Sequence, residues 1–504
     1  MPVSPCWLGS SRWSSWTFTA PGCLLTESRN SGTPCPIAAS NTDGGIGRRR
    51  TGALHGFPDA ISLCPGWNLF SRWEGPGMRQ RSFLEEHHDV SRRYFLDLGL
   101  RSATGGLFAG AVGGGNAARA ADPDPQTSLA SLVDKLEYLT HPEKFGTVER
   151  GNPLPYKLPP EELQAAGMTR KTWRLEVVAD PESNSQVGQP LRRSDGTALD
   201  FDGLMAMARK RSVRFLKTMT CNNMDSPLGT GLWEGVPLRD VIWRVRPGNN
   251  IRRAWFYGYH NNTPSQMFSG SLPIGRVLED PPATPPVILC YRLNGEWISG
   301  RRGGPVRMVV PESYGFRNIK WLNKVFLTNR FNANDTYERG NNDIDSWMKT
   351  LARFISKPRR AKAGQPIPLT GLAQAGINGV SKVQVWVHPK DKPLPKDDPY
   401  FQTAPWHDVK ILPPPGAFGG GLPADAIGPK TPCHGFDGKT GRPILWPLPY
   451  SLAHWAGLAP AVAAGRYDLR CRAINNRGIA QPLPRPYRKS GHCDIERVSL
   501  NVRA

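Results

Sequence analysis

The chain has 504 residues, of which 39% are apolar, so it is long enough for two or three domains with ordinary hydrophobic cores. Its formal charge is +22, but the Lys and Arg residues are spread through patterned segments and form no tail or block. This distribution argues against a nucleic-acid-binding protein and suits an anionic substrate, an anionic cofactor or an acidic electron acceptor.

Residues 1–77 differ in composition from the rest of the chain. They contain no Lys and no Tyr, and they hold four of the nine Cys. They show no hydrophobic period, because Gly, Pro and Ser interrupt every run. We interpret residues 1–77 as an unstructured upstream segment or the result of a mis-set start, with Met78 as the initiator. A small independent domain is the alternative.

Residues 78–120 have the three ordered features of a twin-arginine export signal. The run SRRYFL at 91–96 is close to the twin-arginine pattern, an apolar run of small residues follows at 98–112, and ARA at 118–120 offers a cleavage site. The apolar run is too short and Gly-rich to span a bilayer, and no other stretch qualifies as a transmembrane helix. We therefore predict a periplasmic protein that is exported folded with its cofactor inserted. The start of an ordinary amphipathic helix is the alternative.

Residues 121–356 alternate short strands, turns and brief helices, which predicts an α+β domain. Asn294 and Gly295 form a tight-turn signal between two strands. Strands are expected at residues 173–178, 213–217, 287–291, 307–311 and 324–328, and a helix is expected at 199–209, beginning near Asp200 or Asp202.

Cys221 directly follows the strand predicted at residues 213–217. Asn222 and Asn223 turn the chain there, a Gly-rich loop follows, and a short helix carrying residues 241–243 ends the segment. A thiol at a strand end that faces a glycine-lined cavity could hold a soft metal. For a cysteine taken alone, a buried small apolar side chain is the commoner interpretation.

The residues around Cys221 form part of a longer pattern. Cys221 and Asn223 form a C-x-N motif. It is followed, in order, by GTGLWEGVPL at residues 229–238, SLPI at 271–274, ILCYRLNG at 288–295, RGGPVRMVVP at 302–311 and IKWL at 319–322. These blocks resemble the sulfite oxidase family of molybdopterin-dependent oxidoreductases, and the resemblance covers about residues 129–504. It implies a sulfite-oxidase-type molybdopterin-binding domain, a molybdenum-molybdopterin cofactor, and Cys221 as the thiolate ligand to molybdenum.

The family's cofactor-lining segment supplies the other candidate site residues. Arg302 stands where a His is common in the family, so it is a catalytic candidate as well as a cofactor contact. Taken singly, each Arg is more commonly a solvated surface charge. The candidate phosphate donors are Arg301, Arg302, Arg307 and Lys320, the glycines that would let backbone approach a bulky ligand are Gly303 and Gly304, and Asn223 completes the set.

Residues 357–504 are expected to form strands alone. Alternating or apolar runs at 366–373, 380–387 and 465–473, with turn residues between them, indicate an immunoglobulin-like β-sandwich. The resemblance identifies it with the family's C-terminal dimerisation domain and implies a possible homodimer. The Pro-rich insertion at 388–449 is long for a sandwich loop, and we predict no role for it.

The cysteines bear on export and on electron transfer. The mature chain would keep five of them, and in an oxidising periplasm four could pair; Cys433 with Cys493, both in loop-like sequence, is the first pair we expect. The chain has no C-x-x-C-H haem motif and no C-x-x-C zinc motif. Electrons would therefore pass to or from a separate cytochrome c or quinol-linked partner.

Departures from the family pattern bear on the substrate, which would be a small oxyanion or a sulfoxide. Sulfite oxidisers have arginines just after the cysteine motif and a Tyr before the SLPI-like turn, where this chain has Met224, Asp225 and Phe268. Fewer donors for a small dianion weaken an assignment to sulfite. Three functions stay open: two-electron oxo transfer with a substrate such as sulfite, reduction of sulfoxide-like groups of oxidised protein, and binding without turnover.

Overall fold

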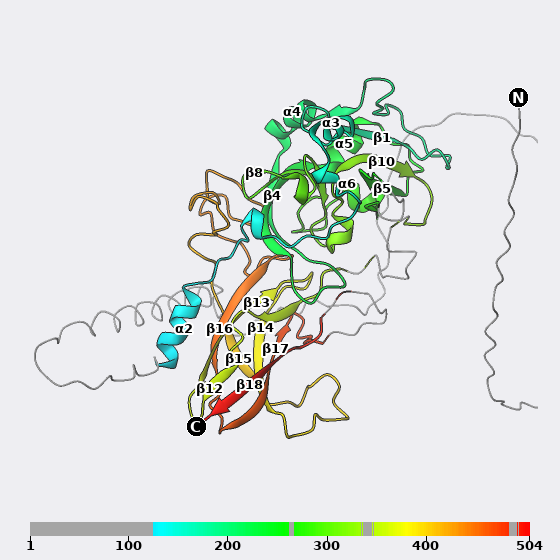
Figure 1. The fold of residues 1–504 in the computed structure, drawn as a ribbon. Helices are drawn as coiled ribbons and strands as arrows, with labels where there is room; N and C mark the ends of the chain where they lie inside the picture. Colours follow the sequence, from blue (N-terminus) through cyan, green and yellow to red (C-terminus); the bar gives the residue numbers. More distant parts are fainter. Residues whose placement is uncertain are drawn as a thin grey trace, which may run out of the picture. The chain divides into compact units, whose positions relative to one another are not determined.

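The computed structural model describes residues 124–261, 267–333, 335, 345, 347–482, 491 and 493–504 (Figure 1). The predicted upstream segment at 1–77 and the predicted export signal at 78–120 lie outside the described residues. The described strands form three sheets with both parallel and antiparallel pairs, and short helices connect them. This mixture agrees with the α+β class expected for the first part of the chain.

The first sheet has the strand order β2-β1-β10-β5-β6. Its strands are β1 (Arg174–Ala179), β2 (Leu199–Asp200), β5 (Arg253–Gly258), β6 (Ser269–Pro273) and β10 (Leu322–Thr328). β1 and β10 run parallel, whereas the other neighbours are antiparallel. Leu175 and Val177 of β1 are buried, whereas Arg174 and Glu176 are only partly buried. The strand predicted at 173–178 is therefore confirmed, and so is the one at 324–328.

The second sheet carries the strand that leads to Cys221. Its order is β3-β4-β7-β8, and β9 pairs with β7. Part of the Gly-rich stretch expected to be a loop after Asn223 belongs to strand β4. Gly235 lies so close to β7 that a Cβ there would be 2.5 Å from the Leu289 carbonyl oxygen, so this glycine serves strand pairing. The strands are β3 (Val213–Met219), β4 (Gly229–Pro237), β7 (Ile288–Leu293), β8 (Glu296–Trp297) and β9 (Arg307–Val309).

Short helices connect these strands. The helix predicted at 199–209 is confirmed as α4, and Asp200 caps it, because its Oδ1 accepts a hydrogen bond from Gly203 N at 2.8 Å. Asn294 and Gly295 have φ angles of 51° and 79°, as the tight turn between β7 and β8 requires. The α-helices are α3 (Pro160–Ala165), α4 (Phe201–Arg211), α5 (Leu238–Arg244) and α6 (Ile274–Leu278), and the 3₁₀ turns are η1 (Pro142–Lys144), η2 (Pro155–Lys157), η4 (Gly300–Arg302) and η5 (Gly315–Arg317).

One hydrophobic core joins the two sheets. It takes Val177 from β1, Val325 from β10, Val236 from β4 and Leu289 from β7. Trp173 is 1% exposed and donates from its indole Nε1 to the Leu322 carbonyl oxygen at 2.7 Å. The core fixes β4, and the pairing of β4 with β3 then fixes the strand that ends before Cys221.

The third sheet is all-β and has the order β11-β13-β16-β15-β14-β17-β18-β12. Its two halves share one core, with Leu369 from β13 and Trp455 from β16 against Val385 from β14 and Leu469 from β17, so the sheet folds over on itself. Figure 1 shows most of these strands gathered together, in yellow to red. The immunoglobulin-like class stays a prediction. The strands are β11 (Leu351–Phe354), β12 (Arg360–Lys362), β13 (Ile367–Gln374), β14 (Lys382–Pro389), β15 (His407–Ile411), β16 (Leu452–Ala459), β17 (Gly465–Ile474) and β18 (Glu496–Arg503).

The third sheet takes in residues from outside 357–504. β11 lies before residue 357 and pairs with β13. Helix α2 (Pro125–Val133), near the start of the described residues, contacts β13 and β16. Strand β11 and helix α2 are therefore both associated with this sheet.

The Pro-rich insertion covers the open edge of β3. A backbone hydrogen bond joins His434 N of the insertion to the Arg214 carbonyl oxygen at 2.7 Å. Directly after the insertion, the Tyr450 carbonyl oxygen accepts from Thr218 N at 2.8 Å. Phe418 and Leu448 of the insertion share a buried cluster with residues of β3 and β4. An exposed edge strand is a site of unwanted pairing, so the insertion protects the strand that leads to Cys221.

The predicted disulfide between Cys433 and Cys493 is wrong. Cys433 is a free thiol, buried in the cluster that the insertion forms with β3. Cys493 lies in the all-β part, where its carbonyl oxygen accepts a hydrogen bond from Gln481 Nε2 at 3.0 Å. Burial raises the pKa of the Cys433 thiol to about 12, so this cysteine acts as a small apolar side chain.

Among the residues that the structure describes, no helix combines the length and the apolar character that crossing a bilayer requires.

Replacing Gln481 tests the all-β core. Gln481 is 1% exposed. Its Oε1 accepts hydrogen bonds from Ala352 N at 2.7 Å and Ala473 N at 2.8 Å. Its Nε2 donates to the carbonyl oxygens of Cys493 and Asp494. Gln481→Leu would leave these backbone groups buried and unpaired, so we expect the free energy of unfolding to fall by about 3 kcal/mol or more. Denaturant unfolding measures this fall.

Gln384→Leu is the matched control, because Gln384 bonds side chains of Asp408 and Arg472 and no backbone group. A Gln481→Leu loss no larger than the control's would contradict the structural role of Gln481.

Candidate functional site

Cys221 lies in the loop that joins β3 to β4. Leu228 N donates to the Met219 carbonyl oxygen at 2.8 Å and closes the base of this loop. Cys221 is 3% exposed, and its sulfur lies 3.8 Å from Asn222 Oδ1. Burial raises the pKa of the thiol, while the backbone N–H groups of Asn223 and Asn222 and the charge of Arg150 oppose the rise. Donors directed at the sulfur favour the thiolate, which is the form that binds a metal.

A cavity opens in front of Cys221. It holds about 560 Å³ of space that no protein atom fills, counted with its open mouth. Most of the lining is apolar or aromatic, and three of the lining side chains are cations. The lining residues are Phe145, Gly146, Thr147, Val148, Met219, Cys221, Leu228, Trp233, Phe268, Arg302, Arg307, Gly315, Phe316, Asn318 and Lys320.

Arg302 holds one wall of the cavity in place. It lies in η4 and is 4% exposed. Its Nε, Nη1 and Nη2 donate to the carbonyl oxygens of Pro142, Gly146 and Glu143 at 3.1, 2.9 and 3.2 Å. Burial, followed by the charge of Arg301, lowers the pKa of its guanidinium. Arg302 therefore fixes η1 and the residues that follow it.

Arg307, in β9, is a buried cation with one N–H group, at Nε, that makes no hydrogen bond to any described residue. Its Nη1 donates to the Arg302 carbonyl oxygen at 2.8 Å and its Nη2 to the Asn318 carbonyl oxygen at 2.7 Å. Its guanidinium lies 5.4 Å from the centre of the Trp233 ring, and its Nε has no hydrogen-bond partner. Burial lowers the pKa of Arg307 to about 10. The unpartnered N–H can serve one further acceptor.

Lys320 is the third buried cation. It is 7% exposed, and its Nζ donates to Thr147 Oγ1 at 2.7 Å and to the Val148 carbonyl oxygen at 2.8 Å. Burial, then the charges of Arg307 and Arg302, lower its pKa to about 7. Both of these hydrogen-bond partners are neutral, and the charge of Glu149 only partly opposes the fall in the pKa of Lys320.

The three cations together prepare the cavity for an anion. Within the described residues, their hydrogen-bond partners are carbonyl and hydroxyl oxygens, and none forms a salt bridge with a carboxylate. Buried charges that are not paired destabilise a protein. The charge of Arg302 lowers the pKa of Arg307, and both arginines lower the pKa of Lys320. An anion bound in the cavity would remove that cost. The phosphate of a pyranopterin is such an anion. The Cys221 thiol, on the same cavity lining, could bind the metal of that cofactor, so these residues fit molybdenum-molybdopterin.

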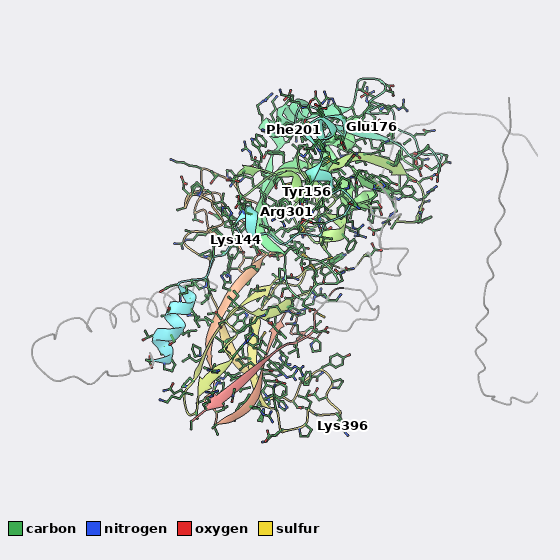
Figure 2. The ribbon with its side chains drawn as sticks, viewed as in Figure 1. Lys144, Tyr156, Glu176, Phe201, Arg301 and Lys396 are labelled. Atoms are coloured by element: carbon green, nitrogen blue, oxygen red, sulfur yellow. The ribbon has the colours of Figure 1, made fainter. Side chains whose placement is uncertain are left out.

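Four of the predicted cofactor contacts do not line the cavity: Asn223, Arg301, Gly303 and Gly304. Arg301 is exposed and pairs with Glu149 at 3.5 Å, and Glu149 also accepts from the Tyr156 hydroxyl at 2.6 Å; Figure 2 labels Arg301 and Tyr156. Gly303 and Gly304 lie beside the protein's own chain.

Gly303 and Gly304 make room for the protein's own chain. Gly303 has a φ of 98°, and a Cβ there would be 2.7 Å from Cγ of Lys320. At Gly304 a Cβ would be 2.1 Å from the Ile298 carbonyl oxygen. The glycines therefore let Lys320 and the turn at Ile298 pack closely, where the sequence predicted an approach to a ligand.

The structure also divides the roles of the two asparagines after Cys221. Asn223 is exposed and is absent from the cavity lining; its backbone N–H is the group that acts on the Cys221 sulfur. Asn222 is 1% exposed and places its side-chain oxygen near that sulfur. The predicted contribution of Asn223 is therefore one of backbone geometry.

Sequence reasoning missed the wall at residues 145–148 and also missed Arg150. Arg150 is near enough to Cys221 for its charge to oppose the rise of the thiol pKa, and its guanidinium lies 4.8 Å over the Phe268 ring. None of these residues belongs to a block that suggested the family. The long separation in sequence hid them, because Arg302 and Lys320 bring this segment to the cavity through backbone carbonyls and Thr147.

Residues 165–336 match the family described as the oxidoreductase molybdopterin binding domain, and this range contains Cys221 and the three cavity cations. Over 102 residues the chain is 33% identical to mitochondrial sulfite oxidase of Rattus norvegicus, which covers 19% of this chain and 18% of that relative. Residues 165–336 are therefore a molybdopterin-binding oxidoreductase domain similar to that of sulfite oxidases and nitrate reductases. The family's cofactor is molybdenum-molybdopterin, the group that the cavity fits.

Other relatives match this chain over segments of similar length. Mitochondrial sulfite oxidase of Drosophila melanogaster is 31% identical over 105 residues, which cover 20% of this chain and 18% of the relative. A nitrate reductase of Pichia angusta is 32% identical over 105 residues, which cover 21% of this chain and 12% of the relative. The matched segments thus span less than a fifth of these relatives. The solved sulfane dehydrogenase SoxCD from Paracoccus pantotrophus aligns with 79% of this chain and 96% of its own at 17% identity, with a TM-score of 0.46.

Cofactor retention should depend on pH through Lys320. Its pKa of about 7 means that above pH 7 it loses its proton unless an anion is bound. An anion favours the protonated form, so cofactor affinity should fall as pH rises, by up to about tenfold per pH unit. Molybdenum retained after dialysis at about pH 6.5 and about pH 8.5 measures the effect.

Lys320→Arg, which keeps its charge over this range, should flatten the dependence. Lys324→Arg is the control, since Lys324 pairs with Glu176 at 3.0 Å on the partly exposed face of β10. Equal retention by the wild-type protein at both pH values would contradict the role of Lys320.

Proposed function

We propose that the chain is a periplasmic, molybdopterin-dependent oxidoreductase that catalyses two-electron oxo transfer. One observation carries the proposal: the Cys221 thiol lines the same cavity as the buried cations Arg302, Arg307 and Lys320, which form no salt bridge in the part of the chain that the structure describes. The bound cofactor supplies the two-electron oxo chemistry. The protein supplies position, exclusion of water and a fixed electrostatic environment.

Each cavity residue has a distinct proposed role. Cys221 is the thiolate ligand to the metal, and the N–H groups of Asn222 and Asn223 stabilise its negative charge. Arg307 and Lys320, two cations of the cavity lining, bind the anionic phosphate. Arg302 was a catalytic candidate from the sequence; its three bonds to carbonyls support a positioning role for it instead.

Arg150 supports an oxyanion substrate such as sulfite. The residues after Cys221 lack the arginines of sulfite oxidisers, as Met224 and Asp225 stand there. Arg150 supplies positive charge near the same sulfur from a different segment of the chain. A small dianion needs such a donor, so this arginine restores part of what the local sequence lost.

The apolar walls support the second candidate, reduction of a sulfoxide. Met219, Leu228, Phe268 and Phe316 line the cavity around Cys221. A sulfoxide carries no net charge and often an apolar body, which such walls can hold. The third candidate, a binding protein without turnover, would keep the cavity and lose the chemistry.

Export, electron transfer and assembly complete the proposal. The twin-arginine pattern at residues 91–96 supports a periplasmic protein that is loaded with cofactor before export. A separate cytochrome c or quinol-linked protein would exchange electrons with the cofactor. The immunoglobulin-like assignment of the all-β part supports a homodimer, and a monomer in light scattering would count against it.

Cys221→Ser should lose the metal site. A serine hydroxyl is a hard, weakly acidic ligand that replaces a soft thiolate, so we expect molybdenum per chain and turnover to fall at least about tenfold. Metal analysis of protein from a molybdenum-competent host measures the first quantity. Cys433→Ser is the control, because Cys433 is a buried thiol outside the cavity. Unchanged metal content and turnover in Cys221→Ser would refute the assignment.

A substrate screen with an Arg150 variant separates the candidate reactions. If an oxyanion binds beside Arg150, Arg150→Gln should raise the KM for sulfite about tenfold or more, since a charge-assisted bond is lost. Reduction of methionine sulfoxide should be less affected by this change. Turnover with the sulfoxide alone would favour the reductase, and a full complement of molybdenum with neither activity would favour a binding protein.

A further inference from the structure

The loop that carries Cys221 is fixed at both ends by residues outside it. After Cys221, the carbonyl oxygen of Asp225 accepts a hydrogen bond from Nε of Arg353, in β11. Before Cys221, the carbonyl oxygen of Thr220 accepts from Gly315 N at 2.5 Å. The two anchors leave a short stretch between them, and that stretch contains the proposed metal ligand.

Arg353 links the loop to the C-terminal part of the chain. It is 4% exposed, and its Nη1 donates to the Asp494 carbonyl oxygen at 2.7 Å and to the Ala352 carbonyl oxygen at 3.1 Å. Gln481 Nε2 holds the same Asp494 carbonyl at 3.1 Å. One buried guanidinium therefore bridges the Cys221 loop and a strand connection of the all-β part.

The other anchor also leads to the C-terminal part. Tyr314, which precedes Gly315, is 1% exposed, and its hydroxyl accepts from Lys349 N at 3.1 Å. Gly491 packs against this tyrosine so closely that a Cβ there would be 2.1 Å from the Tyr314 hydroxyl oxygen. Gly491 also has a φ of 95°, which favours glycine.

We propose that Arg353 is a positioning residue for the metal site, through which the all-β part sets the geometry of the Cys221 loop. With Asp225 held by Arg353, the N–H groups of Asn222 and Asn223 stay directed at the Cys221 sulfur. The all-β part is then a component of the metal site in addition to any role in assembly. This inference rests on the proposed role of Cys221 as metal ligand.

Amide hydrogen exchange in the full, molybdenum-loaded chain tests the inference. Arg353→Met keeps much of the side-chain length and removes the donors, so exchange at residues 222–226 should become about tenfold faster or more. The kcat should fall while KM changes little, because the loop orients the metal ligand and does not bind substrate. Arg353→Lys can reach one carbonyl and should recover part of both effects.

Arg472→Met is the matched control. Arg472 is also a buried arginine of the all-β part, and its partners are Gln384 Oε1 at 2.8 Å and the Phe401 carbonyl oxygen at 3.2 Å. This variant should leave exchange at 222–226 unchanged. If it accelerates that exchange as much as Arg353→Met does, loss of general stability is the cause and the inference is overturned.

Gly491→Ala is an independent variant in case Arg353→Met does not fold. It should push the C-terminal segment from Tyr314 and speed exchange at the same loop. Unchanged loop exchange in Arg353→Met, or in both Arg353→Lys and Gly491→Ala, overturns the inference. Because exchange reports on the loop with or without metal, this failure is distinct from failure of the proposed function, which Cys221→Ser reveals through metal content.

Discussion

Buried positive charge that forms no salt bridge within the described residues is the constraint on which the cavity depends. Arg302, Arg307 and Lys320 all face one cavity, and their hydrogen-bond partners are neutral oxygens. Desolvation lowers the pKa of each of them. A protein that keeps such charges inside destabilises its empty form and gains that free energy back when an anion binds. The cavity is thus organised for an anionic cofactor before its metal is considered.

The rest of the fold holds Cys221 against that cavity. Its strand, β3, is paired on one side with β4 and covered on the other by the Pro-rich insertion. The loop is tied at Thr220 and Asp225 to segments that reach the all-β part. A metal ligand must be held to a fraction of an ångström, and supports from three directions provide such rigidity.

The sequence predicted the local elements and the central cysteine well, because β1, α4 and the turn at Asn294 follow period and turn rules that act over a few residues. It identified Arg307 and Lys320 as cavity cations through family motifs. It did not show that Gly303 and Gly304 pack against the protein's own chain, since sequence does not reveal what lies beside a glycine. Arg150, the 145–148 wall and the Arg353 anchor were missed because each depends on contacts between distant segments.

A crystal structure of protein purified from a molybdenum-competent host, with anomalous diffraction recorded at the molybdenum edge, tests the central claim most directly. The account predicts one molybdenum peak within bonding distance of Cys221 Sγ, and a phosphate in contact with Lys320 and Arg307. A metal peak elsewhere in the chain, or a fully formed cavity in which neither cation contacts an anion, would contradict it.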